Sequence, residues 1–372
     1  MIEFGPRWLE VRAPNQRGFT LIELMVALVV SSLLVGLVLA IFLRMSIGYR
    51  SQQQVSDVQQ VLSAGRAQIE IHAKQVGLGM STGVKILPGG VVSKVSPLRI
   101  INNNNAPDEI AFIYADTANQ ARIIAVGGAN IQVDDNSAFA VDDLVAVVDL
   151  VTVANPIDAT APKIAQYTAC ILKILAKIAG NGVTVSQVAP FGNATQSHCP
   201  ALPNRMMHKV IARAFRIDTS RPTEGPLQMS MTGDLFGLND FQDIGYGFTD
   251  LQVATQFYDS DGVDSADPDT DVNRDWYSSE AQETKTHPAA GSPLEPALQI
   301  TITLVARTER DVEGIASTAT PALTVAGNGD NNEIGDRPSI DLTTTIDPAL
   351  VGSRIYRYIT FTVDLRNMGI GR

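Results

Sequence analysis

An uncharged run near the start of this 372-residue chain is the feature that most constrains its fold. The run has twenty residues, from Leu24 to Leu43, and Arg44 closes it. A helix of this length measures about 30 Å, which matches the hydrocarbon core of a bilayer. The run is too long for the apolar region of an ordinary secretory signal, and no small-residue cleavage site follows it. The sequence therefore predicts a membrane-spanning helix over residues 19–44.

The residues before this run set its orientation and raise a question about one carboxylate. Arg7, Arg12 and Arg17 precede the apolar segment and favour the cytoplasmic side of the membrane. The segment begins directly after Gly18, and its first turns contain a single charge, Glu23. A carboxylate is costly in hydrocarbon, so Glu23 needs a specific reason to be there.

The stretch from Arg17 to Glu23, with the sequence RGFTLIE, resembles the class III signal of type IV prepilins and type II secretion pseudopilins. The resemblance implies that residues 1–18 are a leader that prepilin peptidase removes by cutting between Gly18 and Phe19. It also implies N-methylation of Phe19 and pairing of Glu23 with the N-terminal amine of an adjacent subunit during assembly. The alternative is a plain single-pass anchor with a stray carboxylate, which leaves the RGFTLIE stretch unexplained.

Helical spacing continues beyond the apolar run, which predicts an amphipathic extension over residues 45–76 that stops at Gly77–Gly79. No proline occurs between Phe19 and Ile86, so a continuous helix is expected. The apolar positions of the extension are Val55, Val58, Val61, Leu62 and Ile69.

Strand patterns dominate residues 77–372, which are predicted to form a β-rich globular domain outside the cytoplasm. The fold class is therefore α+β. The resemblance to prepilins implies a pilin-like arrangement, with the long N-terminal helix packed on antiparallel β-sheets. Residues 80–247 have room for an inserted subdomain, and 169–179 is ambiguous between a strand and a short helix. The predicted strands are Ile110–Tyr114, Arg122–Val126, Ile131–Val133, Asp143–Val148, Phe248–Tyr258, Ala297–Thr308 and Tyr356–Asn367.

The order of the last three strands resembles the PilW type of minor pilin, over residues 19–45 and about 248–367. This resemblance implies a structural subunit that primes or caps a type IV pilus, for twitching motility, adhesion or DNA uptake. The implied partners are other minor pilins, the major pilin, prepilin peptidase and the inner-membrane assembly platform. The implied location is the bacterial inner membrane, with a periplasmic domain, and then the pilus tip at the cell surface.

Two other functions are compatible with the same residues. The J-type minor pseudopilin of type II secretion shares much of this layout. A pilin-anchored adhesin or ligand-binding module is the second alternative, because residues 80–247 resemble neither family.

Charge and cysteine content restrict the partners further. The net charge is −11, and removal of residues 1–18 takes away three Arg and two Glu, which makes the mature chain −12. This argues against direct nucleic-acid binding, although Arg354–Arg357 could form a local basic patch. On the periplasmic side, Cys170 and Cys199 are expected to form a disulfide that stabilises by about 3–4 kcal/mol. Two free buried thiols are the alternative.

One acidic loop, residues 259–271, has carboxylates suited to a calcium ion. It is not an EF-hand, because Val263 and Thr270 stand at two ligand positions of that motif. A solvated hairpin loop with an Asp-Gly turn is the simpler alternative. No other cofactor is expected, and the chain has no nucleophile-elbow, Walker or dinucleotide motif, so we expect no enzyme. The candidate ligands are Asp259, Asp261, Asp264, Asp267, Asp269 and Asp271.

Overall fold

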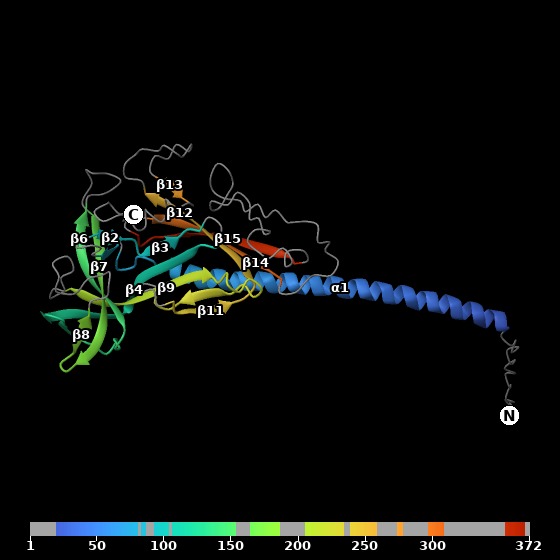
Figure 1. The fold of residues 1–372 in the computed structure, drawn as a ribbon, viewed down its shortest axis with the longest axis horizontal. Coiled ribbons are helices and arrows are strands. Elements are labelled where there is room, and N and C mark those ends of the chain that lie inside the picture. Colours follow the sequence, from blue (N-terminus) through green and yellow to red (C-terminus); the bar gives the residue numbers. More distant parts are fainter. Residues whose placement is uncertain are drawn as a thin grey trace, which may run out of the picture. The chain divides into compact units, whose positions relative to one another are not determined.

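Figure 1 presents a computed structural model of the chain. The structure describes residues 20–80, 83–86, 93–103, 106–153, 164–186, 205–233, 239–258, 274–277, 297–308 and 354–368. The chain divides into two compact units, Met1–Gln53 and Gln54–Arg372.

A single long helix, α1 (Leu21–Ala73, 53 residues), forms the N-terminal part of the described chain. It continues without a break through the apolar run and the polar segment that follows, as the lack of proline predicts. Turns follow Ala73, and Gly77 and Gly79 adopt positive φ angles of 77° and 73°. These left-handed conformations suit glycine and complete the turn after the helix, which ends at Ala73, three residues before the predicted end at residue 76.

The part of α1 in the second unit is amphipathic. Its buried residues are three or four positions apart, which places them on one face of the helix. Polar residues flank this face, where Glu70 pairs with Arg66 at 3.0 Å and with Lys74 at 2.6 Å. The predicted amphipathic extension is therefore confirmed. Its buried positions are Val58, Leu62, Gly65, Ile69 and Ala73.

Two β-sheets account for the rest of the described secondary structure. The larger has eleven strands, and all of its pairings are antiparallel except the one between β1 and β7. Its strands are β1 (Val84–Ile86), β2 (Ser93–Val95), β3 (Leu98–Ile101), β4 (Glu109–Gly127), β5 (Asn130–Val133), β6 (Leu144–Val153), β7 (Ile164–Ile178), β8 (Gly182–Ser186), β9 (Met206–Ile217), β10 (Leu227–Ser230) and β11 (Phe241–Gly245).

The smaller sheet is antiparallel, in the order β13-β12-β14-β15. It brings together the C-terminal segments that resemble the PilW type, and the predicted strands over 248–258 and 297–308 are confirmed. The predicted last strand ends at Asp364 and not at Asn367. The strands are β12 (Phe248–Tyr258), β13 (Arg274–Tyr277), β14 (Ala297–Arg307) and β15 (Tyr356–Asp364).

Two sequence predictions in the larger sheet need refinement. The segments 110–114 and 122–126 belong to one long strand, β4, whose pairing with β9 shifts between Asp116 and Gln120. The ambiguous segment 169–179 is a strand, because it lies almost wholly within β7, which pairs along its length with β6.

Six strands of the larger sheet close into a ring. In order they are β4, β5, β8, β7, β6 and β9, and β9 pairs with β4 to complete the circuit. Alternate residues of five of the strands and Met207 of β9 form one apolar cluster, which Phe139 joins from the segment before β6. Because the ring is closed, each of these strands pairs with a neighbour on both of its sides. The interior side chains are Ala121, Ile123, Ile131, Val133, Phe139, Val145, Val147, Leu172, Ile174, Val183, Val185 and Met207.

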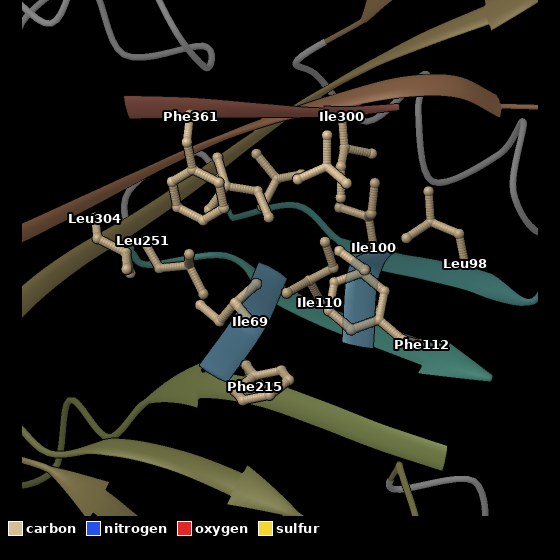
Figure 2. Close-up of a cluster of buried hydrophobic side chains, with 14 of the residues drawn as sticks. Ile69, Leu98, Ile100, Ile110, Phe112, Phe215, Leu251, Ile300, Leu304 and Phe361 are labelled. Carbon is tan, nitrogen blue, oxygen red and sulfur yellow. The ribbon is translucent and has the colours of Figure 1, made fainter. Parts of the chain in front are cut away.

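The main hydrophobic core lies where α1 meets both sheets. Figure 2 shows Ile69 of α1 among side chains of the larger sheet, such as Phe215, and of the smaller sheet, such as Leu251. A buried carboxylate, Asp108, joins the two sheets nearby. It accepts hydrogen bonds from the backbone N–H of Asn103 (3.0 Å) and of Val253 on β12 (2.9 Å). Val253 lies beyond the part of β12 that pairs with β13, so Asp108 satisfies a main-chain N–H that this pairing does not reach.

Gly65 of α1 lies directly against Phe248, the first residue of β12. A Cβ atom at this position would lie 2.8 Å from Cζ of Phe248, whose ring is buried. Glycine normally weakens a helix, but here it makes room for the first side chain of β12. Gly65 is therefore a packing residue.

We expect Gly65→Val to lower the free energy of unfolding by about 2 kcal/mol, because the new side chain overlaps Phe248 in a closed core. Ala67→Val is the matched control, since Ala67 is exposed on the same helix and should change stability by less than about 0.5 kcal/mol. Urea unfolding of the detergent-solubilised protein measures both, and equal stabilities would show that α1 does not pack on Phe248.

A histidine connects the end of α1 to the larger sheet. His72 Nδ1 lies 2.8 Å from the hydroxyl of Tyr114 on β4, and its ring is also 5.8 Å from that of Phe215. Burial, together with the charge of Arg213, lowers the pKa of His72 from its ordinary value of 6.5 to about 4. Between pH 6.5 and about 4, the folded state therefore keeps His72 neutral, whereas the same histidine in the unfolded chain binds a proton.

This pKa shift predicts a loss of stability in acid. The contribution of His72 is fully present above pH 6.5 and is lost as the pH falls toward 4, since the unfolded chain takes up the proton first. We expect wild type to lose about 2 kcal/mol more than His72→Phe over this interval. Urea unfolding at several pH values measures the free energy of unfolding of both proteins. Subtracting one curve from the other removes the contribution of titratable groups that both proteins share. Parallel curves would contradict the assignment.

Candidate assembly site at the start of the first helix

Thr20 and Glu23 together begin α1. The Thr20 hydroxyl accepts a hydrogen bond from the backbone N–H of Glu23 at 3.3 Å. In return, Oε2 of Glu23 accepts from the backbone N–H of Thr20 at 3.0 Å and from its hydroxyl at 2.9 Å. This reciprocal arrangement is a capping box, which satisfies two backbone donors that the first turn would otherwise leave unpaired.

The capping box explains the position of Glu23 but leaves its charge uncompensated. The Glu23 carboxylate accepts hydrogen bonds from two neutral donors of Thr20. Among the described residues, no cation forms an ion pair with Glu23. A carboxylate at the start of a helix also interacts favourably with the helix dipole. Its full negative charge nevertheless remains available to a group outside the described chain.

The apolar side chains of α1 in the first unit have no partners inside the protein. Every residue from Thr20 to Arg44 is exposed. Of the described helices, α1 alone is long and apolar enough to cross a membrane. An apolar surface on all sides of a helix requires lipid or other apolar helices around it. The first unit is thus suited to a bilayer or to a bundle of similar helices.

Several predicted site residues lie outside the described part of the chain. These are the cleavage residues Gly18 and Phe19, the cysteine Cys199, and all six candidate calcium ligands from Asp259 to Asp271. Cys170 is described and lies buried on β7, opposite Val147 of β6. The disulfide and the calcium site therefore stay predictions. Within the described ranges, no three His, Cys, Asp or Glu side chains gather in a metal-binding group.

The predicted basic patch at Arg354–Arg357 contains a cation that the sequence did not suggest. Arg307, at the end of β14, is buried and donates through Nη2 to the carbonyl oxygens of Pro222 and Thr223, the latter at 3.0 Å. Burial and the charge of Arg354 lower the pKa of Arg307. Its role is to hold the segment before β10 against the smaller sheet, so this part of the patch is structural.

Comparison with known proteins bears on the N-terminal segment. Residues 13–39 match the model of the prokaryotic N-terminal methylation motif. This match supports a type IV pilin-like protein. The motif is that of structural proteins, not enzymes, and it implies processing by prepilin peptidase and assembly with membrane machinery. With the exposed apolar helix, it indicates single-pass anchoring in the membrane. No curated protein and no solved structure matches the chain significantly.

Sequence reasoning identified Glu23 as the unusual residue but missed its partner in the chain. The pattern Thr-x-x-Glu before an apolar run is the signature of a capping box, and it was present at Thr20 to Glu23.

Proposed function

We propose that this protein is a minor pilin of the PilW type, a structural subunit that primes or caps a type IV pilus. The observation that carries the proposal is the methylation motif over residues 13–39, placed at the start of a continuous, exposed apolar helix. Prepilin peptidase would cut between Gly18 and Phe19 and methylate the new N-terminus. The mature chain would stay in the inner membrane until the assembly platform incorporates it.

Assembly would replace lipid around α1 with the helices of other minor pilins and of the major pilin. An isolated carboxylate inside such a bundle is costly, so Glu23 needs a cationic partner there. The N-terminal amine of the adjacent subunit supplies that charge. Because the capping box occupies Glu23 only with neutral donors, pairing with an amine needs no existing ion pair to break.

Two features support a minor subunit of the PilW type. Helix α1 lacks the internal proline found in many major pilins, and it continues unbroken to Ala73. The C-terminal segments that carry the PilW resemblance form consecutive strands of one sheet, β12, β14 and β15. The globular part would cap the filament and contact other tip subunits on the periplasmic and then the outer side of the cell.

A second function, a pilin-anchored adhesin or ligand-binding module, is favoured by the ring of β4 to β9. The ring has its own apolar interior, separate from the core around α1. It is compatible with a minor pilin, since the anchor serves both. The J-type pseudopilin differs in its phenotype, because its deletion would abolish exoprotein secretion and leave twitching intact.

Two stabilising elements belong to the same proposal. A disulfide between Cys170 and Cys199 would fix the segment before β9 to β7 after export. A calcium ion held by carboxylates of residues 259–271 would add a cross-link within the segment between β12 and β13.

The mature N-terminus tests the proposed function directly. We expect mass spectrometry of the membrane-extracted protein to find a chain that begins at N-methylated Phe19. The reason is that the RGFTLIE stretch presents glycine, phenylalanine and glutamate at the spacing of the methylation motif. Gly18→Leu should leave the leader attached. An intact Met1 terminus on wild type would refute the proposal.

Variants of Glu23 and Thr20 separate helix capping from charge pairing. Glu23→Gln keeps an acceptor for the capping box and removes the charge, whereas Thr20→Val removes the capping hydroxyl and keeps the charge. We expect Glu23→Gln and Glu23→Ala to be processed normally but to fall at least tenfold in sheared filaments.

Thr20→Val should lose much less, since capping contributes about 1 kcal/mol. Immunoblotting of filament and membrane fractions measures these amounts. If Glu23→Gln assembles like wild type, the charge of Glu23 has no role in assembly.

A further inference from the structure

The outer edge of β15 presents main-chain groups in a fixed order. β15 pairs with β14 over nine residues without a register shift. Thr308 N–H donates to Ile355 O at 3.0 Å, and Leu365 N–H donates to Leu298 O at 2.8 Å. In an antiparallel pair the hydrogen-bonded residues alternate, so every second residue between these two directs its N–H and C=O away from β14. These outward-directed residues are Tyr356, Tyr358, Thr360, Thr362 and Asp364.

No described strand pairs with this outer edge, and the edge lacks the usual protection. The run from Tyr358 to Val363 contains no charge, proline or glycine. One edge strand of the larger sheet, β11, is different: its pairing with β10 contains a register shift, and it exposes Gln242 and Asp243. Charges and irregular pairing prevent edge-to-edge association, and β15 has neither in its centre.

Side-chain contacts on both faces of β15 hold the strand in place. On the face toward the core, Phe361 is buried, and the guanidinium of Arg66 from α1 lies 5.3 Å from its ring centroid. On the other face, hydroxyl pairs join β15 to β14, with 2.9 Å between Thr301 and Thr362 and 3.0 Å between Thr303 and Thr360. A strand fixed in this way can bind a partner without a large entropic cost of ordering.

We propose that the outer edge of β15 binds an extended strand of a neighbouring pilin-like subunit, which adds to the smaller sheet. The inference rests on the proposed function, because assembly supplies the neighbour. Main-chain N–H and C=O groups in strand order are recognised by another main chain, so the ligand class is an extended polypeptide.

Two further observations identify the strand that fits. Exposed Arg357 and Asp364 lie near opposite ends of β15, so they favour a partner strand with an acidic residue near one end and a basic residue near the other. Exposed Tyr358, with 45% of its surface accessible, offers an aromatic cross-strand contact.

A proline at the edge tests the proposal in the full-length protein. The N–H of Thr360 points away from β14, so Thr360→Pro removes an edge donor and no hydrogen bond to β14. Thr360→Ala is the matched control, because it removes the same hydroxyl and keeps the N–H. We expect the two variants to unfold within a few degrees of each other and Thr360→Pro to be at least tenfold depleted from sheared filaments relative to Thr360→Ala.

Equal incorporation of the two variants into filaments overturns the proposal. Amide hydrogen exchange keeps it testable if Thr360→Pro fails to fold. In the detergent-extracted wild-type subunit, the amides of Tyr358, Thr360 and Thr362 should exchange much faster than those of Ile359 and Phe361, and in filaments all five should be slow.

Slow exchange at Thr360 in the extracted subunit shows that the chain covers its own edge, which also overturns the proposal. Failure of the proposed function gives a different result. A wild-type chain with an unprocessed N-terminus, absent from filaments, refutes the pilin assignment and with it the neighbour strand. A processed, filament-borne chain with a fast-exchanging Thr360 amide refutes the edge contact alone.

Discussion

The packing of Phe248 against α1 is the contact on which the rest of the globular part depends. Its ring meets the helix at Gly65, and its backbone is equally constrained. Phe248 N–H donates to Gly225 O at 2.9 Å, and a Cβ atom on Gly225 would lie only 2.0 Å from Phe248 O. Gly225 has a φ of +56°, which favours glycine. One residue at the start of β12 thus connects the helix, the turn before β10 and the smaller sheet.

The parts of this fold that the sequence predicts are those encoded by local patterns. An apolar run, helical spacing and two glycines predict α1 and its end, and continuous apolar or alternating runs predict β12, β14 and most of β15. By contrast, β9 was not predicted, because His208, Lys209 and Arg213 interrupt its apolar pattern. The ring could not be predicted either, since its closure joins β4 to β9 and β5 to β8 across long separations in the chain, and no local pattern specifies such pairs.

The functional residues also separate into those that a local sequence pattern predicts and those that depend on tertiary structure. The motif from Gly18 to Glu23 is a short sequence pattern, so its identification needs no tertiary information, and the methylation-motif match over residues 13–39 agrees with it. The capping box is equally local and was missed only because Glu23 was considered for its charge. The outer edge of β15, with which no described strand pairs, is a different case. Which of its amides point outward depends on register with β14, and register is a tertiary property that residue types alone leave open.

Glu23 and the edge of β15 differ in the free-energy cost of remaining without a partner during the proposed assembly. A buried carboxylate without a cation is costly by several kcal/mol, so under the proposed function a bundle of apolar helices would be stable only when each Glu23 found a positive partner. A strand edge is less demanding, since water satisfies its N–H and C=O groups until a partner replaces it. Pairing of Glu23 would therefore decide whether a neighbour joins at all. The β15 edge would decide which neighbour, because Arg357, Tyr358 and Asp364 select among extended strands by their side chains.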